Sequence, residues 1–404
     1  MLGPLRTRDY RLFWLGSLIA NLGVWIQTTA LSWLVYEMTR RLFLLGAIPF
    51  AGSIPILALG LVGGAIADRA SRRAIMLSSL VALAAGALAL AILTATGHLA
   101  MWHIIAIMMV SGIANALFGP AMQAVIPSIV GSGDLLSAVS LNSVQFNLAR
   151  AIGPALAGLA YDAIGPSGCF ALNGAAILVM VVLVARVRIP RHVQASAPPP
   201  LLRALREAFR YVRPHPVIRP ALVLAAVMSI FGFPYIFLLV AVARDTLGFG
   251  KAMGLGGLLA CVGAGAVTGG LGLSAVGDFP RKDLAATWSA VAFGVVLTGF
   301  ALVGTVRGVA LLLFTLGVLQ TVSVASINTT IQMTVHDGMR GRVMSMMTVI
   351  LFGFAATGAL LIGFVGDWIG VTRAFAVGGV VITTTATIRL LRGFAPARAL
   401  VVED

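Results

Sequence analysis

Apolar residues occur along the chain in runs of roughly 20 residues, separated by short segments that carry charge, proline or glycine. At a rise of about 1.5 Å per residue, such a run forms a helix of roughly 30 Å, the thickness of the hydrocarbon core of a bilayer. A transmembrane barrel would instead show alternating segments of about 10 residues. The pattern therefore predicts an all-α polytopic membrane protein.

Twelve such runs are present, six on each side of a polar central segment. The first run is not followed by a small-residue cleavage site, so we expect it to remain as a helix. We expect helices near 11–38, 45–67, 74–96, 100–122, 139–163, 168–186, 217–243, 252–276, 284–305, 308–331, 343–366 and 372–391.

Charge is scarce, because Asp, Glu, Lys and Arg together make up only 10% of the residues. The net charge of +15 does not indicate a nucleic-acid partner here, because the arginines fall in the connections between apolar runs. Cys169 and Cys261 both lie inside apolar runs, so neither a disulfide framework nor a metal cluster is expected. We expect a monomer.

The distribution of Lys and Arg predicts the orientation. With both termini on one side, that side receives 21 of the 28 Lys and Arg residues and the other side six, while Arg150 falls inside a helix. Because cytoplasmic loops carry the excess of positive charge, we expect both termini in the cytoplasm, with the chain in the cell (inner) membrane.

The central segment divides the chain into residues 1–186, a linker at 187–216 and residues 217–404. Its proline-rich part cannot continue a helix, whereas "LLRALREAFRYVR" predicts an amphipathic helix. This helix would lie on anionic lipids at the cytoplasmic face, and a solvated linker helix fits the pattern equally well. One face carries Leu201, Leu205, Phe209 and Val212, and the other carries Arg203, Arg206, Arg210 and Arg213.

The two halves of the chain resemble each other. "GLAYDAIG" at 158–165 matches "GFVGDWIG" at 363–370, an offset of 205 residues. Asp162 and Asp367 are equivalent in this repeat and mark the outer ends of two helices, so we predict that they are turn or gate residues. The repeat indicates two pseudo-symmetric six-helix bundles.

The stretch "GGAIADRASRRAIM" resembles the loop signature of the major facilitator superfamily, with Ser71 where that family usually has Gly. Four further strings, at 118–130, 147–158, 207–222 and 340–346, resemble its branch of enterobactin-exporter and macrolide-efflux proteins. The signature positions, which we predict to form a cytoplasmic gate, are Gly64, Asp68, Arg69, Arg72 and Arg73. Topology alone would explain the arginines but not the aspartate.

The resemblance implies a secondary active transporter of the major facilitator fold, in which two bundles rock about a central cavity lined by helices 1, 4, 7 and 10. It favours export of an amphipathic small molecule, such as a siderophore or drug, with coupling to protons. Gly153 and Pro154 belong to "GPALAG", which resembles the exporter motif on the fifth helix and would bend or seal the cavity.

Arg150 is a candidate substrate residue, because it falls near mid-bilayer, where a charge costs at least about 2.5 kcal/mol. Asn147 lies on the same helical face and places a polar side chain beside Arg150. The alternative is that Arg150 serves a structural role by bonding helix carbonyls.

Neutral polar and aromatic residues on the cavity-lining helices suggest an amphipathic pocket, although such residues also link helices to one another. The candidates are Asn21, Trp25, Thr28, Asn115, Phe231, Tyr235, Gln320 and Asn328.

Neither Asp nor Glu falls at mid-membrane in the sequence, and Glu37 near the outer end of the first helix is the nearest candidate for a proton carrier. We expect no cofactor and no metal, because the sequence contains neither a Walker motif nor HExxH. An integral membrane enzyme would need clustered histidines or acids, whereas the five histidines are dispersed. An uptake carrier and a transport-inactive sensor or scaffold on the same fold remain as alternatives.

Overall fold

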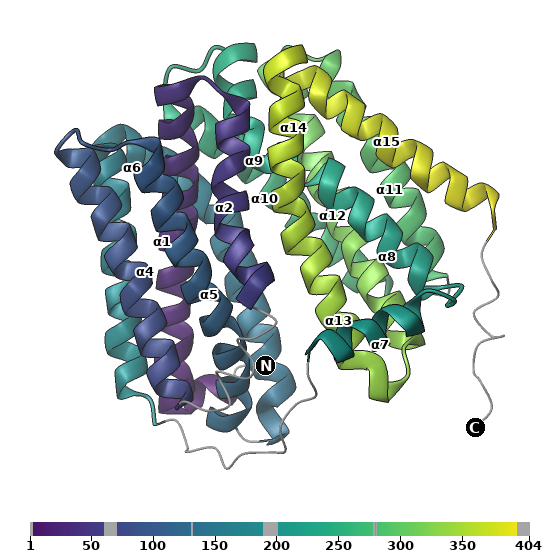
Figure 1. Ribbon diagram of the computed structural model, residues 1–404, viewed down its shortest axis with the longest axis horizontal. Helices are drawn as coiled ribbons and strands as arrows, with labels where there is room; N and C mark the ends of the chain where they lie inside the picture. The colour runs from purple at the N-terminus through teal and green to yellow at the C-terminus, as the bar shows by residue number, and fades with distance from the viewer. Residues whose placement is uncertain are drawn as a thin grey trace. The chain divides into compact units, whose positions relative to one another are not determined.

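The computed structural model describes residues 3–59, 71–130, 132–188, 201–277, 279 and 281–393. Every regular element in these ranges is helical (Figure 1). The predicted all-α class is confirmed.

The helices of the first half match the predicted spans closely. The fourth one runs on to residue 129 rather than 122, through Pro127, and the fifth begins at 135 rather than 139. Short 3-10 turns at Gly3–Arg6 (η1) and Ser132–Asp134 (η2) precede two of them. The helices are α1 (Arg8–Thr39), α2 (Leu42–Leu59), α4 (Arg72–Ala95), α5 (Met101–Ile129) and α6 (Leu135–Arg186).

Helix α6 is two membrane passes joined at a kink. Its 52 residues would span roughly 78 Å if they were straight, more than twice the hydrocarbon thickness. Gly165 breaks the helix with φ 70° and ψ 177°, and Pro166 follows it. These two residues separate the fifth and sixth predicted spans.

The second half contains helices interrupted by π-helical turns, η3 (Met228–Gly232), η4 (Val242–Thr246) and η6 (Ile350–Phe354). Such turns are frequent at functional sites. Its other elements are α7 (Leu201–Val212), α8 (Ile218–Val227), α9 (Pro234–Ala241), α10 (Ala252–Val276), α11 (Lys282–Thr298), η5 (Gly299–Ala301), α12 (Val306–Thr334), α13 (Asp337–Val349), α14 (Ala355–Ile369) and α15 (Val371–Leu391).

Among the described residues, ten helices are long and apolar enough to cross a membrane, and Leu42–Ala58 is a shorter apolar helix. Because α6 provides two passes and Leu42–Ala58 provides one more, the described residues account for the twelve predicted spans.

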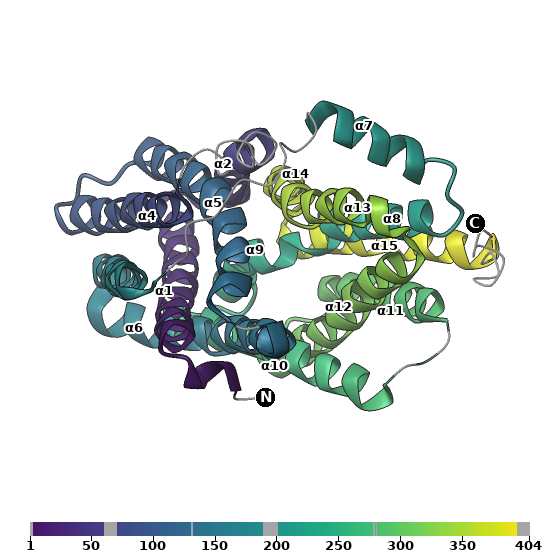
Figure 2. The same ribbon diagram turned by 90° about the horizontal axis from the view of Figure 1, so that it is seen from below.

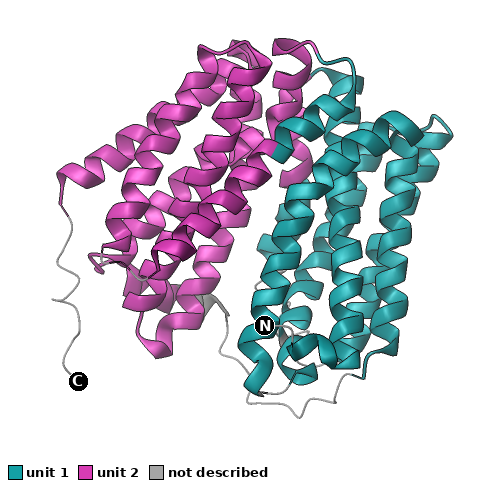
Figure 3. Cartoon of the chain, turned by 180° about the vertical axis from the view of Figure 1, so that it is seen from behind, with its two compact units in different colours: residues 1–40, 51–198, 249–260 teal, residues 41–50, 199–248, 261–404 magenta. Residues whose placement is uncertain are grey.

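Two compact units make up the chain, shown in teal and magenta in Figure 3. Each unit contains the first turns of a helix whose remainder belongs to the other unit: 42–50 of α2 in unit 2 and 252–260 of α10 in unit 1. The predicted division at 186 and 217 stays a prediction. Unit 1 is Met1–Arg40, Ala51–Pro198 and Phe249–Ala260, and unit 2 is Arg41–Phe50, Pro199–Gly248 and Cys261–Asp404.

In unit 1, α6 packs against both α1 and α4 (Figure 2). Two aromatic side chains tie α1 to α6: the hydroxyl of buried Tyr10 donates to the Ala138 carbonyl at 2.8 Å, and the indole of half-buried Trp14 donates to the Leu141 carbonyl at 3.0 Å. Each polar tip is thus satisfied while its ring fills the core. In unit 2, α11 packs against α12 and α15.

Gly165 and Gly370 end the two repeated sequences, and both have positive φ, 70° and 88°, with ψ of 177° and 152°. Only glycine adopts this region readily. Gly165→Ala should therefore destabilise the purified protein by about 1–3 kcal/mol and lower its thermal unfolding midpoint in detergent. A Cβ at Gly165 would meet no atom within 4 Å, so the loss reports backbone strain alone.

Gly272→Ala is the matched control. Gly272 lies inside α10, and a Cβ added there would also meet no atom within 4 Å, so alanine should stabilise by about 0.5–1 kcal/mol. Equal midpoints for the two variants would contradict the role of the Gly165 backbone.

Candidate functional site

Asp162, near the end of the first pass of α6, binds the beginning of α10. Its carboxylate accepts a hydrogen bond from the Ala252 amide at 3.0 Å and another from the Met253 amide at 3.2 Å. These amides belong to the first turn of α10, where backbone N–H groups have no partner within their own helix. Asp162 therefore caps a helix distant in sequence.

Asp367, at the end of α14, binds the beginning of α2 in the same way. The Leu42 and Phe43 amides donate to its two oxygens at 2.6 and 3.4 Å. Arg41 adds an ion pair, with Nε 3.3 Å from Oδ2. The Asp367 side chain is 14% exposed, whereas that of Arg41 is 69% exposed.

The two contacts are equivalent under the internal repeat. The aspartates are 205 residues apart, and Leu42 and Phe43 are 210 residues before Ala252 and Met253. An anion at the C-terminus of its own helix is disfavoured by the helix dipole, typically by about 0.3–1 kcal/mol, and is favoured at another helix's N-terminus. Each carboxylate is therefore disfavoured by the dipole of its own helix and stabilised by the dipole of the helix that it binds.

Glycines make both contacts possible. A Cβ at Gly158 would lie 2.6 Å from the Met253 Cα, and one at Gly363 would lie 2.5 Å from the Leu42 carbonyl oxygen. The repeated pattern "GxxxDxxG" is thus explained: the first glycine permits close approach, the aspartate caps the neighbouring helix, and the last glycine turns the chain. The sequence shows the repeat, but the role of its first glycine was missed.

"GPALAG" packs in the same region of unit 1. The side chain of Trp25 lies against Gly153, and the Pro154 carbonyl lies against Gly256 of α10. Gly153 and Pro154 are both buried. Their predicted sealing role stays a prediction, but they lie at close helix contacts.

Arg150 is half-buried on α6, and Asn147 is exposed one turn earlier, where its side chain donates to the Ser143 carbonyl at 2.9 Å. Gln145, which lies between Ser143 and Asn147 in sequence, is buried, and its Oε1 has no hydrogen-bond partner among the described residues. Polar side chains on this segment of α6 therefore alternate with exposed apolar ones, Val144, Phe146 and Leu148.

The other unit 1 candidates are more scattered. Asn21, Trp25 and Thr28 are half-buried along α1, and Thr28 donates to the Val24 carbonyl at 2.8 Å. Asn115 is exposed on α5 and donates to the Ser111 carbonyl at 2.9 Å. Both hydrogen bonds are local to one helix.

In unit 2, the structure brings two of the candidates together. The Tyr235 hydroxyl donates to Gln320 Oε1 at 3.1 Å, and both side chains are buried. Phe231 is half-buried on the same segment, and Asn328 Oδ1 accepts from Gln332 at 3.0 Å. Tyr235 and Gln320 thus link two helices, whereas contact with a substrate stays a prediction.

Of the predicted loop gate, Gly64, Asp68 and Arg69 lie outside the described residues. Arg72 and Arg73 begin α4, and Arg73 donates from Nη2 to the Ala185 carbonyl. Ser71 is the N-cap of α4, because its hydroxyl accepts from the Ala74 amide at 3.0 Å. This hydrogen bond explains a serine where the resemblance leads us to expect glycine.

Glu37, the candidate proton carrier, is exposed near the end of α1 and accepts a hydrogen bond from Tyr161 at 3.1 Å. Tyr161 also meets Trp33 edge to face, with ring centroids 6.4 Å apart. Within the ranges that the structure describes, no group of three His, Cys, Asp or Glu residues is placed to hold a metal ion.

The family described as transmembrane secretion effector, in the major facilitator superfamily, matches residues 1–399. The chain belongs to this family. This membership confirms the resemblance seen in the sequence.

Its relatives include the staphyloferrin A transporter of Staphylococcus aureus, 25% identical over 376 residues, which cover 91% of this chain and 92% of that protein. Macrolide efflux protein A of Streptococcus pyogenes is 23% identical over 70% of this chain and 71% of its own length. The multidrug efflux pump Tap of Mycolicibacterium fortuitum is 22% identical, with 89% of each chain covered.

Solved structures support the fold. A bacterial homologue of the human lysosomal transporter Spinster, in an inward-facing and unoccupied conformation, aligns with a TM-score of 0.75 at 13% identity, covering 97% of this chain and 98% of that one. The nucleoside transporter NupG aligns with a TM-score of 0.76 at 10% identity, covering 98% and 99%. At these identities the likeness establishes the major facilitator fold.

The capping contacts can be tested by truncating the carboxylates. Asp162→Ala and Asp367→Ala should each destabilise the protein by about 0.5–2 kcal/mol, because each leaves two amides without their cap. Asp162→Asn and Asp367→Asn should retain only part of the stability, since the side-chain oxygen of asparagine can accept from one of the two amides while its NH2 group cannot accept from the other. Thermal unfolding in detergent measures the differences.

Asp337→Ala serves as the control, because Asp337 pairs only at the surface with Arg340, at 2.8 Å with 83% of its side chain exposed. Such pairs contribute about 0–1 kcal/mol. If the capping variants lost no more stability than this control, the two contacts would not hold the helices.

Proposed function

We propose that this protein exports an amphipathic small molecule, a siderophore or a drug, across the inner membrane. The match to the transmembrane secretion effector family over nearly the whole chain carries this proposal. The names of the relatives, macrolide efflux protein A and multidrug efflux pump Tap, favour efflux, and the staphyloferrin A transporter favours a siderophore as one cargo class. The relatives are carriers, which argues against an enzyme.

The proposed orientation places both termini in the cytoplasm. It rests on the 21 Lys and Arg residues assigned to that side against six on the other. In this orientation the Asp162 and Asp367 contacts lie at the outer ends of their helices. The Asp68 loop lies at the inner ends.

The proposed mechanism is alternating access. Opening the outer side requires the first turns of α2 and α10 to leave Asp367 and Asp162. Each carboxylate cap contributes about 0.5–2 kcal/mol, so the contacts can hold the helices and still break during a transport cycle. Asp68 would serve as the corresponding gate at the cytoplasmic side.

We propose that Arg150, Asn147 and the neutral residues of both units contact the cargo. An arginine at this depth favours an anionic or hydrogen-bond-accepting group. Glu37 is the proposed proton carrier. Its carboxylate accepts a hydrogen bond from the Tyr161 hydroxyl, and protonation of the carboxylate would remove the negative charge that strengthens this bond. The carrier would work as a monomer, without a cofactor.

Direction and cargo class can be tested in everted membrane vesicles. With an imposed pH gradient, acid inside, vesicles that contain the protein should accumulate a macrolide or staphyloferrin A more than vesicles without it, and an uncoupler should abolish the difference. Accumulation in right-side-out vesicles alone would instead identify an uptake carrier. The same assay is repeated with a panel of lipophilic drugs. If no compound is transported in either vesicle orientation, the result would argue for a transport-inactive protein.

Arg150→Ala should lower the transport rate in the same vesicles at least about tenfold, because a hydrogen bond to a charged group contributes about 1.5–3 kcal/mol. Arg150→Lys should retain part of the rate by keeping the charge. Arg307→Ala is the control, since Arg307 is exposed at the start of α12 and no cargo role is proposed for it. A full rate for correctly inserted Arg150→Ala protein would remove Arg150 from the cargo site.

A further inference from the structure

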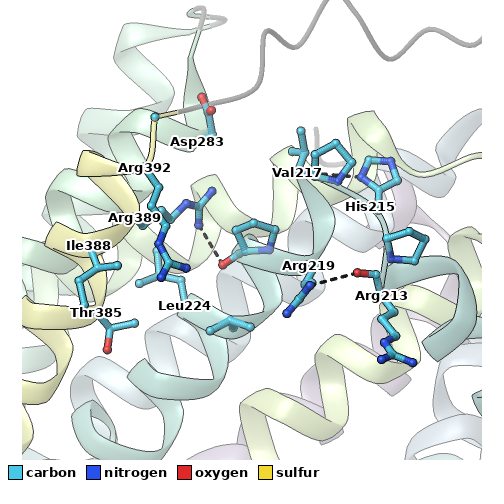
Figure 4. Close-up of a pocket in the computed structure, with 15 residues that line it drawn as sticks. Arg213, His215, Val217, Arg219, Leu224, Asp283, Thr385, Ile388, Arg389 and Arg392 are labelled. Atoms are coloured by element: carbon cyan, nitrogen blue, oxygen red, sulfur yellow. Dashed lines mark hydrogen bonds between the residues drawn. The ribbon is translucent and has the colours of Figure 1, made fainter.

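Unit 2 contains a pocket between the beginning of α8 and the end of α15, with a volume of about 410 Å³ (Figure 4). Four arginines line it, one acid faces them, and none of these residues has a part in the proposed transport cycle. The arginines are Arg213, Arg219, Arg389 and Arg392, and the acid is Asp283.

Backbone contacts position two of the arginines. Arg389 donates from Nη1 to the Pro220 carbonyl at 3.1 Å, and Arg219 donates from Nη1 to the Arg213 carbonyl at 3.5 Å (Figure 4). A guanidinium has five N–H donors, so the single bond from Arg219 leaves it further donors for a ligand. The fork of donors matches the oxygens of a phosphate group.

His215 shapes the pocket without adding charge. Its Nδ1 accepts hydrogen bonds from the Val217 and Ile218 amides, both at 3.3 Å, and so caps the beginning of α8. Burial lowers the pKa of His215 below its usual 6.5, which favours the neutral ring. The positive charge therefore comes from the arginines.

The pocket continues from the arginines onto apolar surface of two membrane-spanning segments. Val223, Leu224 and Ile388 line this part, together with Thr385. Val223 is 48% exposed and Ile388 is 43% exposed, so both are available to a hydrocarbon chain. One end of the pocket thus suits an anion and the other suits an acyl chain.

The adjoining helix α7 extends the basic surface. It packs on α13 through the Glu207–Arg342 ion pair at 2.8 Å and through the His336 amide, which donates to the Tyr211 hydroxyl at 3.3 Å. Val212 is buried, whereas Phe209 is 60% exposed, so Phe209 does not share the buried face. Beside it lies a second hollow of about 420 Å³, lined by Arg206, Phe209, Arg210, Arg213, Pro214 and Arg219.

We propose that the Arg213–Arg219–Arg389–Arg392 pocket binds the phosphate of an anionic phospholipid, with an acyl chain along Val223 and Ile388. Basic pockets between membrane helices are suited to such headgroups. The apolar half and its position on two spanning segments favour a lipid over a free phosphate ion. This site is independent of the cargo and of the direction of transport, so the proposed function can fail while the lipid site stands.

The test uses the full-length protein in mild detergent, titrated with phosphatidylglycerol and, separately, with phosphatidylcholine of the same acyl chains, with bound lipid counted by native mass spectrometry. Phosphatidylglycerol should bind at least about tenfold more tightly. The triple variant R213Q/R219Q/R392Q should lose this preference, because removing one arginine near an anionic surface weakens binding roughly fivefold. Arg389 is kept, since its bond to the Pro220 carbonyl joins α15 to α8, whereas the bond from Arg219 to the Arg213 carbonyl is local.

The matched control is R186Q/R188Q/R340Q, which removes the same charge from exposed positions outside the pocket. This variant should keep the preference for phosphatidylglycerol. Equal losses in both triple variants would show a general charge effect and overturn the site. Circular dichroism of both variants checks that the helices are retained.

Inorganic phosphate and glycerol phosphate distinguish the two sources of the phosphate group. At millimolar concentration they should leave the bound phosphatidylglycerol in place, because they lack the acyl chain. Displacement by inorganic phosphate at a concentration comparable to that of the lipid would overturn the lipid assignment. Equal binding of phosphatidylcholine and phosphatidylglycerol would overturn the anion site itself.

Discussion

The arrangement of the ends of α6, α14, α2 and α10 depends on one interaction. In it, a carboxylate at the end of one helix binds the first turn of another. Asp162 holds α10 and Asp367 holds α2, in each case through two backbone amides. The first amides of a helix have no partner within their own helix, and the carboxylate oxygens supply that partner here. The same contacts explain why each compact unit contains the first turns of a helix that continues in the other.

The sequence was sufficient to predict the fold, because lipid leaves few alternatives. A run of about 20 apolar residues must form a helix that satisfies its own backbone, so the twelve spans follow from hydropathy alone. Helix ends were harder to place. α5 continues through Pro127 to residue 129, where the polar and proline-containing sequence predicted an earlier end. Neighbouring helices supply the packing that sustains this last turn, and no local pattern reports it.

The candidate site was predictable only in part, since the sequence identifies residues but not their partners. The repeat singled out Asp162 and Asp367, yet the amides that they cap lie about 90 and 325 residues away in the chain. Tyr235 and Gln320 were predicted separately as pocket residues, and the structure shows in addition that they form a buried hydrogen-bonded pair. Neutral polar groups in apolar surroundings seek each other, and which groups meet is decided by tertiary packing.

The duplicated contacts differ in one charge, and this difference has a consequence for ionic conditions. Arg41 and Lys251 occupy equivalent positions, 210 residues apart. Among the described residues, Arg41 forms an ion pair with Asp367, whereas Lys251 forms none with Asp162. An exposed ion pair is screened by salt over a Debye length of about 8 Å at physiological ionic strength, whereas short amide caps are screened much less. A rise in salt concentration should therefore weaken the Asp367 contact with α2 and leave the Asp162 contact with α10 nearly unchanged.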